Sequence, residues 1–178
     1  MKPTAQQVID ILGLTPHPEE GGYFIETHRA DEGVEADALP ARYGAPRRHS
    51  TAIYYLLTPT TYSHMHKLES DEVFHFYLGD PCEMLQLHPD GRGETVRLGP
   101  DLAAGERPQV VVPRGSWQGS RLVAGGSVAL MGCTVSPGFE YEDYEHGSRA
   151  DLIQGWPDWK QAILDRTHAD QAPDGEDC

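Results

Sequence analysis

Short apolar runs separated by turn residues fill the sequence from Ser50 to Gly138. Thr51–Leu57 and Val73–Leu78 are apolar on both faces, which is typical of strands that are covered on both sides. Met84–Leu87 and Thr95–Leu98 flank a Pro-Asp-Gly-Arg-Gly turn, in which glycine permits positive φ. About eight short strands at this spacing predict an all-β sandwich or barrel with jelly-roll topology.

Two further strands are predicted around a glycine-rich turn. Leu122-Val123 and Val128–Met131 are joined by Ala-Gly-Gly-Ser, and this pattern predicts a hairpin. Another strand, Gln109–Val112, ends at Pro113. The strands of the barrel are therefore expected to continue as far as Met131.

The segments outside these strands are predicted to be helical or irregular. Thr4 and Gln7 form a capping-box pattern before an apolar stripe, so a helix is expected there, ending near Gly13. Residues 30–48 are rich in Asp, Glu, Gly and Pro and are expected to form a mobile excursion. Residues 150–164 predict helical cover interrupted at Pro157. We expect an N-terminal helix (1–15), the barrel (16–145), a C-terminal helical cover (146–167) and a disordered acidic tail (168–178).

The composition narrows the classes of partner. The net charge is −14, which disfavours nucleic acid and anionic membrane surfaces as partners. No apolar stretch approaches the ~20 residues that span a bilayer, and no signal-peptide pattern is present at the N-terminus. Cys82, Cys133 and Cys178 contain no Cys-x-x-Cys pair, so we expect no disulfide framework and a cytoplasmic location.

Several polar residues that could bind a metal or transfer protons lie on or next to the predicted strands. His64 and His66 are two residues apart, so their side chains would leave a strand on the same face. Glu72 follows at the next strand, and Gln118 comes after a later turn. A small barrel that brings such groups together predicts a site for a metal or a small polar molecule.

These residues resemble the cupins. His64, His66, Glu72 and Gly79 match the order of the first cupin motif. In the second motif, Pro-x-Gly-x-x-His, Pro113 and Gly115 match, but Gln118 stands in place of the histidine. The likeness is greatest to a bacterial and fungal branch labelled as a domain of unknown function, through the segments 16–22, 50–54, 70–77, 109–118 and 132–139.

The resemblance implies a double-stranded β-helix, usually a homodimer, with the site inside the mouth of the barrel. It implies no single reaction. Relatives in the wider superfamily include metal-dependent dioxygenases, sugar isomerases, metal-free sugar-nucleotide epimerases and seed storage proteins. Fold alone does not choose among them.

The first interpretation of the site is a metal centre. His64, His66 and Glu72 supply two imidazoles and a carboxylate, the facial set that Fe(II) enzymes use and that also suits Zn, Mn or Ni. Gln118 offers only a neutral amide oxygen, which is a poor donor to these ions. One divalent ion, weakly held by His64, His66, Glu72 and Gln118, is therefore expected under this interpretation.

The second interpretation is an acid–base site. On a regular strand Glu72 and His75 face opposite sides, while His75 and Tyr77 share one side. If His75 and Tyr77 point inward, an imidazole base and a phenol acid could act on a substrate. Which of Glu72 and His75 faces the interior is left open by the sequence.

The favoured function is a cupin that binds a small polar metabolite, with isomerase or epimerase activity on a carbohydrate-like or keto-acid substrate. His66 or His75 would be the base, Tyr77 the acid, and Gln118 would orient the substrate. Trp117 could form a wall of the pocket, and Arg114 could bind a carboxylate or phosphate at its mouth. The alternatives are a metal-dependent dioxygenase built on His64, His66 and Glu72, and a non-catalytic binding or storage module whose histidines turn outward.

Overall fold

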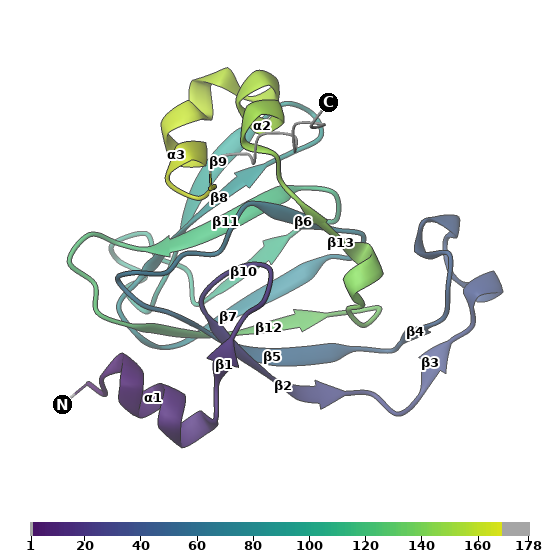
Figure 1. The fold of residues 1–178 in the computed structure, drawn as a ribbon, viewed down its shortest axis with the longest axis horizontal. Helices are drawn as coiled ribbons and strands as arrows, with labels where there is room; N and C mark the ends of the chain where they lie inside the picture. Colours follow the sequence, from purple (N-terminus) through teal and green to yellow (C-terminus); the bar gives the residue numbers. More distant parts are fainter. Residues whose placement is uncertain (1, 169–178) are drawn as a thin grey trace, which may run out of the picture.

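Two antiparallel sheets face each other in the computed structural model, which describes residues 2–168 (Figure 1). The six-stranded sheet has the order β1 (Thr15–Pro16), β2 (Tyr23–Arg29), β5 (Thr51–Leu57), β12 (Ala129–Val135), β7 (Glu72–Gly79) and β10 (Gln109–Val112). The five-stranded sheet has the order β13 (Tyr144–His146), β6 (His66–Leu68), β11 (Trp117–Leu122), β8 (Cys82–Leu87) and β9 (Gly93–Leu98). The predicted all-β fold, a jelly-roll double-stranded β-helix, is confirmed.

The main core lies between the inner faces of the two sheets. Its buried members come from both sheets and include Tyr55, Phe74, Met84, Leu98 and Met131. Strand alternation puts Phe74 inside and leaves its neighbour His75 on the other face. The same alternation decides which polar side chains of β7 enter the barrel.

The N-terminal helix α1 (Ala5–Leu12) covers part of the outer face of the six-stranded sheet. The backbone N–H of Gln7 donates to Thr4 Oγ1 at 3.2 Å, and Gln7 Oε1 accepts from the backbone N–H of Thr4 at 2.9 Å. The predicted capping box is confirmed, as is the helix end at Gly13, whose φ is +66°. Val8 is buried against Leu56 of β5.

The C-terminal segments cover the outer face of the five-stranded sheet. They are α2 (Arg149–Gly155), the 3-10 turn η4 (Pro157–Trp159) and α3 (Lys160–Leu164). Leu152 and Ile163 are buried with Leu85 of β8. The break at Pro157 is as predicted, because proline has no N–H for a continuing helix. Residues 169–178 of the predicted acidic tail lie outside the described residues. Between residues 2 and 168, no helix is long and apolar enough to cross a membrane.

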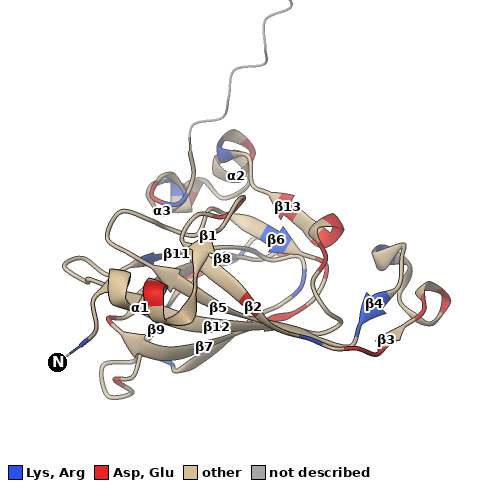
Figure 2. Ribbon diagram, turned by 60° about the horizontal axis from the view of Figure 1, so that its bottom comes forward, with Lys and Arg blue, Asp and Glu red and all other residues tan. Residues whose placement is uncertain are grey.

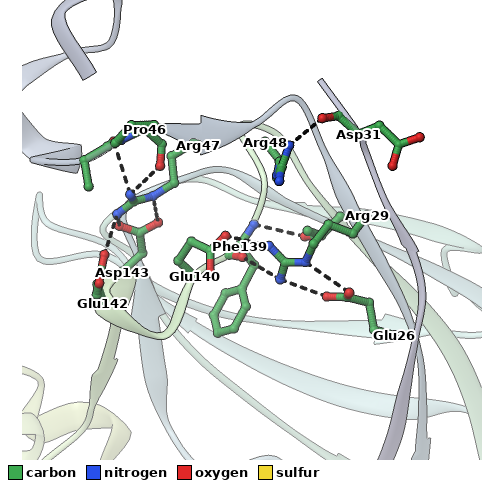
Figure 3. A network of polar contacts seen from close by, with 12 residues as sticks. Glu26, Arg29, Asp31, Pro46, Arg47, Arg48, Phe139, Glu140, Glu142 and Asp143 are labelled. Atoms are coloured by element: carbon green, nitrogen blue, oxygen red, sulfur yellow. Dashed lines mark hydrogen bonds and ion pairs between the residues drawn. The ribbon is translucent and has the colours of Figure 1, made fainter. Parts of the chain in front are cut away.

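The segment expected to be a mobile excursion has secondary structure and buried contacts. It contains β3 (Gly33–Val34), η1 (Ala36–Ala38), η2 (Ala41–Tyr43) and β4 (Arg47–Arg48), and it extends from the barrel in Figure 1. Arg47 is 2% exposed and binds Asp143 through two hydrogen bonds of 2.8 and 2.6 Å (Figure 3). Figure 2 shows the basic strand β4 in blue and the acidic turn η3 (Tyr141–Asp143), just before β13, in red. This ion pair fixes the base of the excursion to the barrel.

The predicted hairpin around the Ala-Gly-Gly-Ser turn is wrong. β11 and β12, which the turn connects, belong to different sheets. β11 pairs with β6 and β8, while β12 pairs with β5 and β7. A glycine-rich turn lets the chain reverse, but the available neighbours decide the pairing. The turn predicted between Met84–Leu87 and Thr95–Leu98 is confirmed, and the strands that it joins, β8 and β9, pair in antiparallel fashion.

Candidate functional site

His66 and Gln118 lie opposite each other on β6 and β11, and both are 1% exposed. The Nδ1 of His66 donates to the carbonyl oxygen of His64 at 2.7 Å, so in the neutral ring Nε2 carries the free lone pair. That nitrogen accepts from Gln118 Nε2 at 3.1 Å. The ring also stacks on Tyr144, with centroids 5.1 Å apart. His66 is therefore fixed in both tautomer and orientation.

Glu72 reaches the same place from the opposite sheet. Its Oε2 accepts from Gln118 Nε2 at 2.5 Å. Burial, and after it the charge of Glu20, raise the pKa of Glu72 to about 8, against the opposing effect of hydrogen bonds from Gln118 and Cys133. Glu72 thus faces the interior as a carboxyl group that holds its proton near neutral pH.

The loop between β1 and β2 brings His17 and Glu20 to this group. His17 Nδ1 accepts from the backbone N–H groups of Glu19 at 3.2 Å and Glu20 at 2.9 Å, so its Nε2 carries the proton. Glu20 Oε1 lies 3.5 Å from His66 Nε2 and 3.8 Å from His17 Nε2. Burial lowers the pKa of His17, which favours its neutral form.

The loop is held in a single shape by its glycines and by the barrel. Gly21 and Gly22 have φ of +86° and +72°, a region that side chains other than glycine rarely adopt. The hydroxyl of Tyr55 donates to the carbonyl of Gly21 at 2.8 Å. The backbone N–H of His64 donates to the carbonyl of Glu20 at 2.8 Å. These contacts therefore fix the backbone that carries Glu20.

A cavity of about 80 Å³ opens beside these groups. Its polar lining includes His17, Glu20 and Glu72, and its apolar lining includes Phe24 and Phe139. The remaining described lining residues are Glu26, Arg29, Thr51, Ile53, Leu68, Cys133, Val135 and Tyr141. His66 and Gln118 are not among the described lining residues and instead contact the carboxyl groups that are. The carboxyl groups of Glu20 and Glu72 thus line the cavity together with the imidazole of His17.

Sequence reasoning missed His17 and Glu20 as members of the site. The His-Pro-Glu-Glu-Gly-Gly stretch lies in the segment 16–22, which carries part of the family resemblance. The signal in the sequence was the pair Gly21-Gly22, because consecutive glycines indicate a backbone conformation that other residues rarely adopt.

The four predicted metal ligands are not brought together. His66, Glu72 and Gln118 meet, but His64 precedes β6 and faces elsewhere. His64 Nδ1 donates to the carbonyl of Met65 at 3.0 Å, and its Nε2 accepts from the backbone N–H of His168 at 3.2 Å. Both ring nitrogens are therefore occupied.

The surroundings of His64 confirm that it belongs to a separate cluster. Its ring stacks on His146, with centroids 3.7 Å apart. Burial lowers its pKa to about 4. Over residues 2–168, no group of three or more His, Cys, Asp or Glu residues could hold a metal ion. The donor set therefore does not fit the weakly held Fe, Zn, Mn or Ni ion that the motif predicted.

His75 and Tyr77 do not line the barrel, so the structure does not have the alternative, left open by the sequence, in which both point inward. Both lie on the outer face of the six-stranded sheet, because Glu72 and Phe74 take the inner positions of β7. His75 Nδ1 is 3.3 Å from Gln109 Nε2, and its Nε2 is 3.4 Å from Thr134 Oγ1. The side chain of Tyr77 is 51% exposed.

Trp117 and Arg114 are also outside the cavity. Trp117 alternates with Gln118, so it faces outward, where Lys67 Nζ lies 4.5 Å from its ring centroid. It packs with the buried residues under the C-terminal helices. Arg114 is exposed, and its backbone N–H donates to Asp71 Oδ1 at 2.8 Å. Neither residue is among the described lining residues of this cavity.

Comparison with known proteins agrees with this architecture. The family model described as cupin superfamily (DUF985) matches residues 6–147. The chain belongs to this cupin family. The cupin is 32% identical over 148 residues to the uncharacterized protein YML079W of Saccharomyces cerevisiae, covering 78% of this chain and 73% of the yeast protein.

Two solved structures are similar to this cupin over almost its whole length. Protein SO0799 from Shewanella oneidensis is 33% identical with a TM-score of 0.83, covering 94% of this chain and 99% of that one. A hypothetical protein from Leishmania major is 34% identical with a TM-score of 0.82, covering 93% and 99%. These likenesses show the family and the fold of this cupin and no specific activity. The homodimer and the cytoplasmic location stay predictions.

Proposed function

We propose that this cupin binds a small polar metabolite in its cavity and catalyses proton transfer on it, as an isomerase or epimerase does. One observation carries the proposal: two carboxyl groups, Glu20 and Glu72, line the same cavity. Burial keeps Glu72 protonated near neutral pH, with a pKa of about 8. Paired carboxyl groups in unequal environments are suited to divide the roles of base and acid.

The two groups can complete a balanced isomerisation of an α-hydroxy aldehyde. Glu20 removes the proton from the α-carbon while Glu72 protonates the carbonyl oxygen, which gives an enediol. Glu72 then takes the proton of the second hydroxyl, and Glu20 returns its proton to the former carbonyl carbon. The product is the α-hydroxy ketone, both carboxyl groups are restored, and no oxidant or reductant is needed.

His66 and Gln118 serve as positioning residues in this proposal. Gln118 donates to both Glu72 and His66, so one amide holds the acid in place and fixes the imidazole beside Glu20. His66 is 1% exposed, whereas a non-catalytic storage module was expected to turn its histidines outward. This burial favours the catalytic proposal over that alternative.

Hydrogen exchange with solvent tests the proposal without knowledge of the natural substrate. The protein is incubated in D₂O with three- to six-carbon hydroxy aldehydes, hydroxy ketones and 2-keto acids, and loss of the α-proton signal is followed by NMR. We expect exchange with at least one compound, and a loss of about 10²- to 10⁴-fold in Glu72→Gln and Glu20→Gln. The controls are His75→Gln and Tyr77→Phe, which change the outer face of the same strand and should exchange at the original rate. Absence of exchange with every compound, or equal rates in all four variants, would reject the proposal.

A further inference from the structure

We infer that the cavity accepts neutral or cationic molecules that donate hydrogen bonds, and that it rejects carboxylates and other small anions. For turnover, this inference rests on the proposed function and narrows its substrates to uncharged or cationic hydroxyl or amino compounds. It removes the 2-keto acids from the substrate classes considered above. For binding alone, it depends only on the lining of the cavity.

Acceptors predominate among the polar groups around the cavity. Glu20, Glu26 and Glu72 contribute carboxyl groups to its wall, and Arg29 is the only Lys or Arg among the described lining residues. A carboxylate that entered would meet like charge from Glu20 and Glu26. Like charge at close range in a partly desolvated site is strongly unfavourable.

Arg29 is not free to compensate for this charge (Figure 3). Its Nε and Nη2 donate to the two carboxylate oxygens of Glu26 at 3.1 and 2.9 Å. Nη1 donates to Glu140 at 2.5 Å, and Nη2 also donates to the carbonyl of Phe139 at 3.3 Å. These contacts use four of the five N–H donors of a guanidinium group. A carboxylate ligand could bind Arg29 well only by displacing one of the two glutamates.

A buried acceptor beside Glu72 lacks a donor. Gln118 uses its amide nitrogen to bind Glu72 and His66, and its Oε1 is buried without a hydrogen-bond partner. An unpaired buried acceptor is unfavourable, and a donor or a bridging water removes this cost. Gln118 is not among the described lining residues, so in the cavity itself the carboxylates of Glu20 and Glu26 are the acceptors that favour ligands with hydrogen-bond donors.

The other walls suit an apolar body on the ligand. Phe24, Ile53, Leu68, Val135 and Phe139 line the cavity beside the carboxyl groups. Its volume of about 80 Å³ is smaller than the ~150 Å³ of an engineered apolar cavity that holds benzene. A short branched molecule with one polar end matches both the size and the polarity of this space.

Three compounds with the same branched skeleton test the inference: isobutylamine, isobutanol and isobutyrate. Binding to the full-length protein at pH 7 is followed by NMR, through the backbone signals of Glu20 and Gly21. We expect the amine or the alcohol to bind at least tenfold more tightly than the carboxylate. Isobutyrate binding as tightly as the others, or no binding by both the amine and the alcohol, would overturn the inference.

A variant that removes one partner of Arg29 makes the binding test more specific. Glu140→Gln removes one of the two carboxylates from Arg29, so the preference against isobutyrate should fall several-fold. The matched control is Glu142→Gln, since Glu142 is 74% exposed and lies 3.6 Å from Arg47 instead. An unchanged preference in Glu140→Gln would contradict the role given to Arg29. If discrimination holds but no compound exchanges its α-proton, the proposed function fails while this inference stands.

Discussion

Gln118 donates a 2.5 Å hydrogen bond to Glu72 across the interior of the barrel, and the two residues belong to opposite sheets. The same amide nitrogen also reaches His66, so one side chain of β11 connects a polar group of β6 with one of β7. This arrangement occupies the place where a cupin with a histidine in its second motif would present an imidazole. The chemistry of the site depends on how these groups share protons.

Replacing Gln118 with methionine tests the energetic value of this amide. The change keeps the length of the side chain but leaves the buried Glu72 without its donor. We expect the free energy of unfolding in urea to fall by about 1–3 kcal/mol. Gln109→Met is the control, because Gln109 is exposed on β10, and its change should stay within about 0.5 kcal/mol. Equal losses of unfolding free energy in the two variants would show that the hydrogen bonds of Gln118 make no specific contribution to stability.

The pH dependence of stability should reveal the raised pKa of Glu72. Burial and the charge of Glu20 raise that pKa from 4.5 to about 8, so between these pH values the folded state holds a proton that the unfolded chain releases. The stabilisation is complete below about pH 4.5 and is lost as the pH rises through about 8. Glu72→Gln should remove this decline, which amounts to a few kcal/mol because each pKa unit corresponds to about 1.4 kcal/mol. Urea unfolding at pH 5 and pH 9 measures it, and parallel profiles of the two proteins would contradict the assignment.

Metal removal should leave the fold unaffected. His64 uses both ring nitrogens in hydrogen bonds, and the His66 lone pair accepts from Gln118, so the cupin motif does not form a metal-binding set. EDTA is expected to leave the Tm unchanged, whereas an ion at 100 times its Kd would contribute about 2.7 kcal/mol. Protein purified without added metal should contain less than about a tenth of an equivalent of iron, nickel, manganese or zinc. A stoichiometric ion, or a fall of several degrees in Tm with EDTA, would refute this prediction.

The ion pair at the base of the β3–β4 excursion should be important for stability. Asp143→Asn leaves Arg47, which is 2% exposed, without its carboxylate, and breaking such a buried pair costs about 3–5 kcal/mol. Glu142→Gln removes a second carboxylate from the same arginine, but Glu142 is 74% exposed and its effect should be within about 0.5 kcal/mol. Urea unfolding compares the two variants. A small loss in Asp143→Asn would mean that the excursion is not fixed by this contact.

Alanine substitutions at two glycines test whether the loop that carries Glu20 is rigid. Gly21 and Gly91 have φ of +86° and +88°, so alanine is strained at both by about 1–2 kcal/mol. Only at Gly21 would a Cβ also meet the carbonyl oxygen of Tyr62, at 2.7 Å, while Gly91 has open space. Gly21→Ala should therefore lose more stability than Gly91→Ala and should also weaken binding of isobutylamine. Equal stability and binding in the two variants would show that the loop adapts.

Local patterns were enough to predict much of the fold. The capping box at Thr4 and Gln7 and the hairpin of β8 and β9 depend on neighbouring residues, and both are present. The strand spacing and the cupin motifs predicted the barrel itself, since alternation of apolar residues reports which faces are covered. The same period of two predicted that Glu72 and His75 lie on opposite faces, but not which face is the interior.

The tertiary structure decided what the sequence left open, because pairing partners and loop shape depend on contacts between distant segments. The chain between β11 and β12 crosses from one sheet to the other instead of forming a hairpin. His64 turns away from His66 because regular strand geometry begins only at His66. Glu20 joins the site because Gly21 and Tyr55 fold its loop over the barrel. By itself the sequence determined a cupin barrel with a polar interior, and the packing of its two sheets determined that the carboxyl groups of Glu20, Glu26 and Glu72, rather than the paired histidines, line the cavity.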